Sequence, residues 1–294
     1  MSKRRSAALA SLVPLLVLAA ACAPADDESA ADPSTDSTAS VSADACETDQ
    51  LPLLTDGTLT IGTDSPAYEP WFVDNDPTNG EGYESAVAYA VAEQLGFSAD
   101  EVTWVTVPFN TSYKPGAKPF DFDINQISIT PSRAKVVDFS DGYYAAAQAV
   151  IALKGSPVSE ISSIADLADY NLGAQTGTTS LSAITDIIKP ANDPLVFEDT
   201  NAAKQALNNG QVDAILADLP TAFYISAVEI SGSEIVGQFQ PETGEQEEFG
   251  MLFEKGSELV PCVDAALAAL REDGTLDEIQ QRWLSDVVSV PELS

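Results

Sequence analysis

One cation of this chain stands where it could bind a small carboxylate. Arg133 follows an alternating apolar stretch, residues 122–129, and comes just after Thr130 and Pro131, a pair typical of a helix start. We therefore expect Arg133 in a first helical turn, where the helix dipole disfavours a cation unless an anion binds there. A guanidinium grips a carboxylate through two parallel hydrogen bonds. The alternative is an ion pair with a surface acid such as Asp138.

An acid occupies a comparable position later in the chain. Asp218 ends the apolar run VDAILAD and precedes Pro220. It therefore lies at the carboxyl end of a predicted strand, where open α/β sheets bind their ligands. Asp218 either caps the helix that follows or accepts a ligand ammonium group. Beside Arg133 it would complete a clamp for a zwitterion, with the carboxylate at Arg133 and the ammonium at Asp218.

Further candidate contacts follow other predicted strand ends. Residues 176–180, TGTTS, open a helix, so the amides of Thr178 and Thr179 would face a bound anion. A hydroxyl-capped helix without a ligand gives the same pattern, and the Gly-Lys-Ser/Thr signature of a phosphate loop is missing. Five more residues belong either to the core or to the wall of a site. They are the aromatic Tyr68, Trp71 and Phe109 and the polar Glu84 and Gln126.

Composition excludes several classes of function. The chain has no histidine, which rules out His-based catalytic triads and disfavours zinc sites, so we expect no metal and no cofactor. Thirteen Lys and Arg against 46 Asp and Glu give a formal net charge of -33. Such a surface repels nucleic acid and anionic lipid, and solubility is its simplest explanation.

The N-terminus is typical of an exported lipoprotein. Three basic residues precede an apolar run, residues 7–21, that is too short for a comfortable membrane span and predicts a signal peptide over residues 1–21. The string LAAAC, which ends at Cys22, resembles the lipobox of bacterial lipoproteins, in which the cysteine is lipidated. Residues 22–45 are rich in Ala, Asp, Ser and Thr and predict a flexible tether. Ordinary secretion with a buried Cys22 is the alternative.

Two further cysteines, Cys46 and Cys262, remain in the exported part. In an oxidising compartment two cysteines are more often a disulfide than two free thiols. Cys46 precedes the first predicted strand and Cys262 begins a helix near the C-terminus. A bond between them would tie the two ends of the folded part into one lobe.

The elements that position these residues form two successive α/β series. The first has strands at 59–63, 102–107, 123–129 and 147–153 and a helix at 83–95. The second has strands at 171–175, 195–197, 214–217 and 234–239, with helices at 164–167, 179–188, 201–208 and 220–228. A segment at 249–253 and helices at 261–272 and 276–285 complete the chain.

About 240 folded residues in two series predict two lobes, each a mostly parallel sheet flanked by helices. We assign residues 46–149 and 240–294 to the first lobe and residues 150–239 to the second. The chain would cross between the lobes near 148–152 and near 236–240. Two crossovers form a hinge, and a hinge between lobes forms a cleft that can open and close.

The motifs together resemble those of the extracellular solute-binding proteins of polar amino-acid ABC transporters. The similarity extends from Leu59 to Leu284 and rests on five segments, in order: GYESAVAYAVAEQLG, ITPSRAKVVDFSDGYY, AQTGTTS, NGQVDAILADLPTAFY and DGTLDEIQQRWL. The resemblance implies a two-lobed, type II periplasmic-binding-protein fold. It also implies a free amino-acid ligand, an ABC permease with a cytoplasmic ATPase as partners, and a monomer without nucleic acid that is held outside the cytoplasmic membrane only by its N-terminal lipid.

The same resemblance implies roles for individual residues. Arg133 matches the arginine that binds the ligand α-carboxylate, Thr179 the residue whose amide assists it, and Asp218 the acid that takes the α-amino group. Ser128 matches a residue that contributes main-chain or hydroxyl contacts. Tyr68 and Phe109 match aromatic residues that flank the ligand side chain in the family. Trp71 lies close behind them.

Two departures from the family pattern concern the side-chain pocket. Gln126 stands where the family usually has a small residue, and the spacing from Asp64 to Tyr68 is one residue longer. A pocket with Gln126 and Glu84 favours a polar or cationic ligand over an aliphatic one. Two alternatives use the same scaffold: an exported enzyme similar to cyclohexadienyl dehydratases, with Glu84 as its general acid or base, and a ligand sensor.

Overall fold

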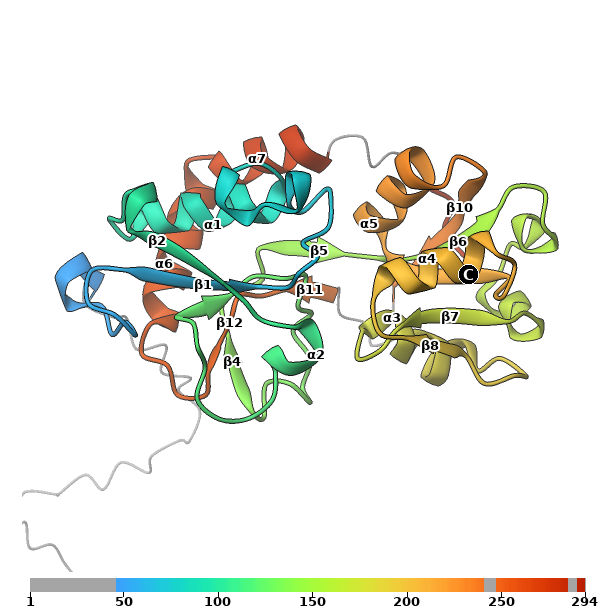
Figure 1. The fold of residues 1–294 in the computed structure, drawn as a ribbon, viewed down its shortest axis with the longest axis horizontal. Coiled ribbons are helices and arrows are strands. Elements are labelled where there is room, and N and C mark those ends of the chain that lie inside the picture. The colour runs from blue at the N-terminus through green and yellow to red at the C-terminus, as the bar shows by residue number, and fades with distance from the viewer. Residues whose placement is uncertain (1–45, 241–246, 285–289, 294) are drawn as a thin grey trace, which may run out of the picture. The chain divides into compact units, whose positions relative to one another are not determined.

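Two five-stranded sheets form the body of the protein in the computed structural model, which describes residues 46–240, 247–284 and 290–293 (Figure 1). These residues all belong to one compact unit, Val41–Ser294. The predicted signal peptide, the lipidated Cys22 and the tether lie outside the described residues. In the described part, no helix is both long enough and apolar enough to cross a membrane.

The first sheet has the strand order β2-β1-β3-β12-β4. β1 pairs with β2 and β3 in parallel, whereas β12 is antiparallel to both β3 and β4. The sheet is therefore mixed, and our expectation of a mostly parallel sheet was wrong. The bounds are Leu59–Thr63 for β1, Val102–Thr106 for β2, Phe122–Asp123 for β3, Val137–Phe139 for β4 and Leu252–Glu254 for β12.

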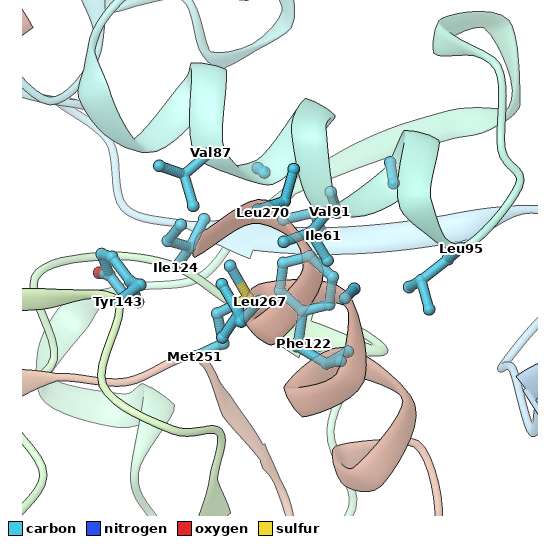
Figure 2. Close-up of a cluster of buried hydrophobic side chains, with 14 of the residues drawn as sticks. Ile61, Val87, Val91, Leu95, Phe122, Ile124, Tyr143, Met251, Leu267 and Leu270 are labelled. Atoms are coloured by element: carbon cyan, nitrogen blue, oxygen red, sulfur yellow. The ribbon is translucent and has the colours of Figure 1, made fainter. Parts of the chain in front are cut away.

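Three helices cover this sheet and pack on one another: α1 (Tyr83–Gln94), α6 (Val260–Glu272) and α7 (Thr275–Leu284). Figure 2 shows how side chains from α1 and α6 meet those of the strands in one buried cluster. β1 is buried along its whole length, including its two threonines, Thr60 and Thr63. α1 stops where expected, since Gly96 adopts the left-handed conformation (φ +87°) that ends a helix.

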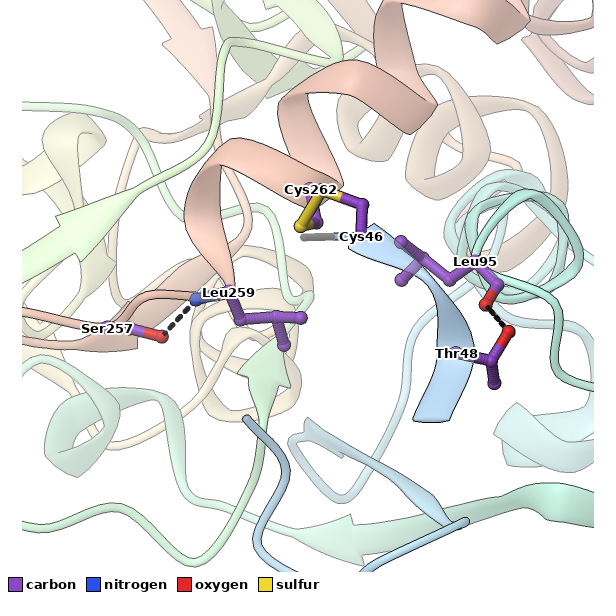
Figure 3. The surroundings of a disulfide bond; sticks show 6 residues. All are labelled: Cys46, Thr48, Leu95, Ser257, Leu259 and Cys262. Atoms are coloured by element: carbon purple, nitrogen blue, oxygen red, sulfur yellow. Dashed lines mark hydrogen bonds between the residues drawn. A yellow bond between two sulfur atoms is a disulfide. The ribbon is translucent and has the colours of Figure 1, made fainter. Parts of the chain in front are cut away.

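The predicted disulfide between Cys46 and Cys262 is present (Figure 3). It closes a loop with a sequence separation of 216 residues and fixes the start of the folded part to α6. The adjoining turn is held as well, because the Thr48 hydroxyl donates a 2.9 Å hydrogen bond to the Leu95 carbonyl at the end of α1. The bond forms between the predicted cysteines, but it does not bring both ends of the folded part into one lobe, because residues 290–293 pack on the second sheet.

The second sheet has the order β10-β6-β9-β7-β8 and is also mixed, with β6 antiparallel to both neighbours and β7 parallel to both of its own. Separate apolar clusters pack on it. Its strands are β6 Gln148–Leu153, β7 Leu172–Gln175, β8 Leu195–Phe197, β9 Ala214–Asp218 and β10 Ser233–Phe239. Its helices are α3 Thr179–Ser182, α4 Thr200–Asn208 and α5 Leu219–Tyr224, and π-helical turns Ala183–Ile188 and Ile225–Glu229 extend α3 and α5.

The two segments that cross between the lobes do not lie at the predicted residues. Residues 148–152 and 236–239 are not crossovers, because they belong to β6 and β10, which pair with each other. The crossings lie just outside, where β5 (Tyr144–Ala146) and β11 (Glu247–Phe249) form an antiparallel pair that runs between the sheets in Figure 1. The 290–293 segment, assigned to the first lobe from the sequence, instead pairs with β10, and Leu293 joins the core of the second lobe.

Two local predictions also fail near Arg133. The strand predicted over 123–129 ends at Asp123, since Gln126 turns the chain with a left-handed φ of 46°. No helix begins at Pro131, and residues 131–136 form turns. The remaining helices are short: α2 Phe109–Ser112 and 3-10 turns at Thr48–Gln50, Val73–Asn75, Pro77–Asn79, Ala99–Glu101, Pro157–Glu160 and Ile164–Asp169.

Candidate functional site

A polar cavity lies between the carboxyl ends of strands from both sheets. The first lobe contributes the segment after β1, the start of α2 and the turn after β3, and the second lobe contributes the starts of α3, α4 and α5. Seven of the ten residues predicted to bind ligand line it: Tyr68, Phe109, Gln126, Ser128, Thr178, Thr179 and Asp218. The sequence therefore identified about half of the residues that line this cavity.

Arg133 does not line this cavity but an adjoining one, and the two share Thr178 and Thr179. Its guanidinium donates to two main-chain carbonyls, those of Ser128 at 2.7 Å and Gly177 at 2.9 Å. The second bond crosses from the first lobe to the second. The guanidinium also lies 4.8 Å from the centre of the Tyr113 ring, a cation–π distance.

The guanidinium of Arg133 is buried, with 7% of the residue exposed. Within the residues that the structure describes, the Arg133 side chain forms no ion pair. Asp138, the acid considered as its partner, pairs with Lys255 at 2.5 Å instead. The surface ion pair considered from the sequence is therefore not formed. Burial lowers the pKa of Arg133, and Glu247 and Asp218 act against that shift. A buried cation with no carboxylate partner is a site where an anion is favoured.

Gly177 lets the two lobes approach closely at this point. Its φ of +75° suits glycine, and a Cβ there would lie 2.2 Å from the Tyr113 hydroxyl. The Ser128 and Thr179 hydroxyls also meet across the lobes at 3.3 Å. The described structure is thus a closed arrangement.

Asp218 ends β9 and is half-buried at the cavity wall. Its carboxylate accepts a 3.1 Å hydrogen bond from the Gln148 amide. The helix-cap alternative is not realised, because the Asp218 side chain makes no capping bond to α5. Burial, and then the nearby Glu247, raise the pKa of Asp218 well above its usual range, whereas the Gln148 bond and Arg133 lower it. An ammonium group would relieve this destabilised carboxylate.

Of the three predicted aromatic residues, Tyr68 and Phe109 flank the cavity and Trp71 does not. Trp71 is fully buried among Tyr83, Tyr144 and Phe249, with ring centroids 5.4–5.8 Å apart. Its indole N–H donates a 2.8 Å hydrogen bond to Thr221 of α5 and so connects the lobes. Trp71 therefore belongs to the core and the interlobe contact in this structure.

Glu84 is also fully buried and lies behind the cavity wall. Its carboxylate accepts hydrogen bonds from the Gln126 main chain at 2.6 Å, from the Gln126 side-chain amide and from the Tyr143 hydroxyl. These bonds hold Gln126 in its left-handed conformation, and Gln126 in turn reaches the cavity. Burial raises the pKa of Glu84 to about 7, although all three bonds oppose the shift.

Glu84 should make the stability of the protein depend on pH. Between pH 4.5 and 7 the carboxyl is ionised in the unfolded chain and protonated in the folded one, so the free energy of unfolding falls as pH rises. A shift from 4.5 to about 7 corresponds to roughly 3 kcal/mol. We expect Glu84→Gln to remove that part of the slope in urea unfolding measured from pH 4 to 8.

Glu93→Gln, on the exposed side of the same helix, is the matched control and should leave the slope unchanged. A Glu84→Gln variant whose pH dependence follows that of the wild type would show that Glu84 titrates normally.

The cavity also contains residues that the sequence analysis did not select. Asp64 directly follows β1, much as Asp218 ends β9, so its position at a strand end was an available signal. It accepts a 3.1 Å bond from the Phe109 amide, and burial raises its pKa. The others adjoin selected residues or lie at further strand ends and helix starts. They are Asn125, Gln175, Ser180, Thr200, Leu216, Ala217 and Thr221.

The end of the cavity near Asn125 lies close to a buried, unpaired acid of the described chain. Asp123 is fully buried, and neither of its carboxylate oxygens has a hydrogen-bond partner in the described part of the chain. The side-chain nitrogen of Asn125, which faces the cavity, is also unpaired there. Burial, then the neighbouring Glu84 and Asp64, raise the pKa of Asp123 well above its usual range. Polar or cationic groups suit this end better than an aliphatic chain.

The model of the bacterial extracellular solute-binding proteins, family 3, matches residues 59–286. The chain belongs to this family. It is 31% identical to the L-cystine-binding protein TcyA of Bacillus subtilis over 240 residues, which are 79% of this chain and 83% of TcyA. It is 29% identical to the glutamine-binding protein GlnH of the same organism, over 71% of this chain and 76% of GlnH.

Solved structures agree with the family. An ancestral arginine-binding protein bound to arginine superposes with a TM-score of 0.66 at 32% identity, covering 78% of this chain and 98% of that one. The ancestral amino-acid-binding protein AncCDT-1, described as a precursor of cyclohexadienyl dehydratase, gives 0.64 at 31% identity over 77% and 95%. These matches confirm the predicted two-lobed, type II periplasmic-binding-protein fold. The family's amino-acid-binding members are components of ABC transporters and work outside the cytoplasm.

Proposed function

We propose that this protein is a lipid-anchored receptor that captures a free polar amino acid between its lobes and delivers it to an ABC permease with a cytoplasmic ATPase. The ligand α-carboxylate binds Arg133 with help from the Thr179 amide, and the α-ammonium binds Asp218. Arg133 and Asp218 come from different lobes, so only the closed form satisfies both ends of the ligand.

One observation carries the proposal: a buried guanidinium with no carboxylate partner among the described residues lies near a destabilised carboxylate of the other lobe. A free amino acid supplies the missing charge to both. Thr178 and Thr179 line both cavities and mark the path between the two charges. Binding to Arg133 requires a ligand carboxylate to displace or join its present carbonyl partners.

The side chain of the ligand extends between Tyr68 and Phe109 toward Asp64, Asn125 and Gln126. Acid and amide groups there favour a side chain that donates hydrogen bonds, such as an amide, an amine or a guanidinium. Relatives named for glutamine and arginine binding are consistent with such a side chain.

Isothermal titration calorimetry with the twenty protein amino acids tests capture directly. We expect at least one of them to bind in the micromolar range or tighter, about 8 kcal/mol or more of binding free energy. If none binds more tightly than roughly millimolar, about 4 kcal/mol, the receptor assignment is wrong.

The anchor and the cellular role have separate tests. Metabolic labelling with palmitate should mark the full chain and fail to mark a Cys22→Ser variant, and a labelled Cys22→Ser variant would contradict lipidation there. Uptake of the bound amino acid should fall when the protein is deleted from its host. Unchanged uptake would favour a sensor that uses the same binding residues.

A dehydratase on this scaffold is the second candidate, because the similar AncCDT-1 is named as the precursor of such an enzyme. Its chemistry needs an acid or base that reaches the substrate. Glu84 has a pKa near 7 but lies behind the cavity wall. Incubation with prephenate and with arogenate distinguishes the candidates, since turnover of either would establish the enzyme.

A further inference from the structure

Glu247 connects the residues at the two charged ends of the site. It begins β11 and pairs with Ala146 of β5, in the crossing between the sheets. Its carboxylate accepts a 2.6 Å hydrogen bond from the Ser128 hydroxyl and a 2.9 Å hydrogen bond from the Gln148 side-chain amide. In the sequence, Glu247 lies in an acidic stretch, residues 241–248, whose composition is typical of a surface turn.

The same two donors reach the predicted ligand-binding residues. The Gln148 nitrogen lies 3.1 Å from the Asp218 carboxylate, so one amide separates Asp218 from Glu247. The Ser128 hydroxyl lies 3.3 Å from that of Thr179. Glu247 is therefore connected to the cavity wall directly through Ser128 and, through Gln148, to Asp218.

The carboxylates of Asp218 and Glu247 are not neutralised by a nearby cation of the described chain. Asp218 and Glu247 repel each other, and neither forms an ion pair with Lys or Arg among residues 46–240, 247–284 and 290–293. Arg133 is close enough to affect Asp218 but is bonded to main-chain carbonyls. Two carboxylates bridged by one neutral amide attract a cation with several N–H donors, and an ammonium group has three.

We propose that Glu247 is a second carboxylate acceptor for the ligand α-ammonium and that it selects amino acids over the corresponding 2-hydroxy acids. This inference rests on the proposed function. The ammonium lies between Asp218 and Glu247, with Gln148 holding the two carboxylates at a fixed separation. A 2-hydroxy acid brings no positive charge and leaves the two carboxylates in repulsion, so it binds less well.

If Glu247 competed with the ligand carboxylate, its removal would change the binding affinity in the opposite direction. Glu247 also acts on the pKa of Arg133, so it could instead occupy the place of the ligand carboxylate in the empty protein. In that case removing its charge would tighten binding. The effect of one substitution therefore decides between acceptor and competitor.

The test compares Glu247→Gln with Glu248→Gln, the same change at the next residue of β11, whose side chain is exposed. Wild type and both variants are titrated with the twenty amino acids, and the amino acid bound most tightly is then compared with its 2-hydroxy analogue. We expect Glu247→Gln to weaken binding of the amino acid about 10- to 100-fold and binding of the hydroxy acid less than about threefold. Glu248→Gln should match the wild type, and both variants should keep the wild-type melting temperature.

Three outcomes would overturn the inference. Unchanged or tighter binding by Glu247→Gln would mean that Glu247 does not accept the ammonium. An equal loss in Glu248→Gln would assign the effect to general surface charge. Equal losses for the amino acid and the hydroxy acid would assign Glu247 to the framework of the site. Failure of the wild type to bind any amino acid would instead remove the proposed function itself, and the inference with it.

Discussion

Replacing Arg133 with lysine is expected to weaken amino-acid binding by about a hundredfold or more, although the positive charge is kept. The guanidinium fork now serves two carbonyls, of Ser128 and Gly177, and lies over the Tyr113 ring. A lysine ammonium is a compact point charge that cannot bind a carboxylate bidentately while also satisfying both carbonyls. A loss of this size corresponds to about 2.7 kcal/mol of binding free energy, within the range of a charge-assisted hydrogen bond in a buried site.

Titration calorimetry of the purified variant measures this loss. Arg282→Lys, at an exposed position of α7, is the matched control and should bind as the wild type does. A circular dichroism melt of each variant separates lost binding from lost folding. If Arg133→Lys binds the amino acid within about threefold of the wild-type affinity, then binding of the ligand carboxylate does not require the guanidinium group of Arg133.

Removal of the disulfide should have the largest effect on stability. Replacing both Cys46 and Cys262 with serine opens a loop with a sequence separation of 216 residues, which greatly enlarges the ensemble of the unfolded chain. We expect the free energy of unfolding to fall by roughly 2–5 kcal/mol. Urea unfolding of the double variant against the oxidised wild type measures this difference.

Binding should respond much less than stability to the loss of this bond. Neither cysteine lines the cavity, and the bond ties together the N-terminal turn and α6 within one lobe. Below its unfolding transition, the double serine variant should keep its affinity within about threefold. A large loss of affinity in the folded double variant would instead mean that the bond shapes the site.

Local patterns predicted most elements and about half of the residues that line the cavity. Strands such as β1 and β8 appear at the predicted residues, because segments this short between turn signals favour strands over helices. Asp218, Thr178 and Thr179 were found because ligands gather at strand ends in open α/β sheets.

The errors share one physical cause, which is pairing between distant segments. The turn at Gln126 depends on the Glu84 carboxylate, 42 residues away, and that bond ends the strand predicted through Ile129. Because β6 and β10 pair with each other, the crossovers lie outside the predicted residues. Leu293, which was assigned to the first lobe, packs on the second lobe against Gly237. Glu247 enters the site because β11 pairs with β5. None of these contacts leaves a signal within a local window of sequence.

Calorimetric comparison of one amino acid with two of its analogues tests the central claim most directly. The wild-type protein is titrated with the amino acid that it binds most tightly, with the amine that lacks its α-carboxylate and with the 2-hydroxy acid that lacks its α-amino group. Because Arg133 and Asp218 each require one of these groups, we predict that both analogues bind at least about a hundredfold more weakly, a loss of about 2.7 kcal/mol each. Either analogue binding as tightly as the amino acid itself would contradict the two-ended clamp.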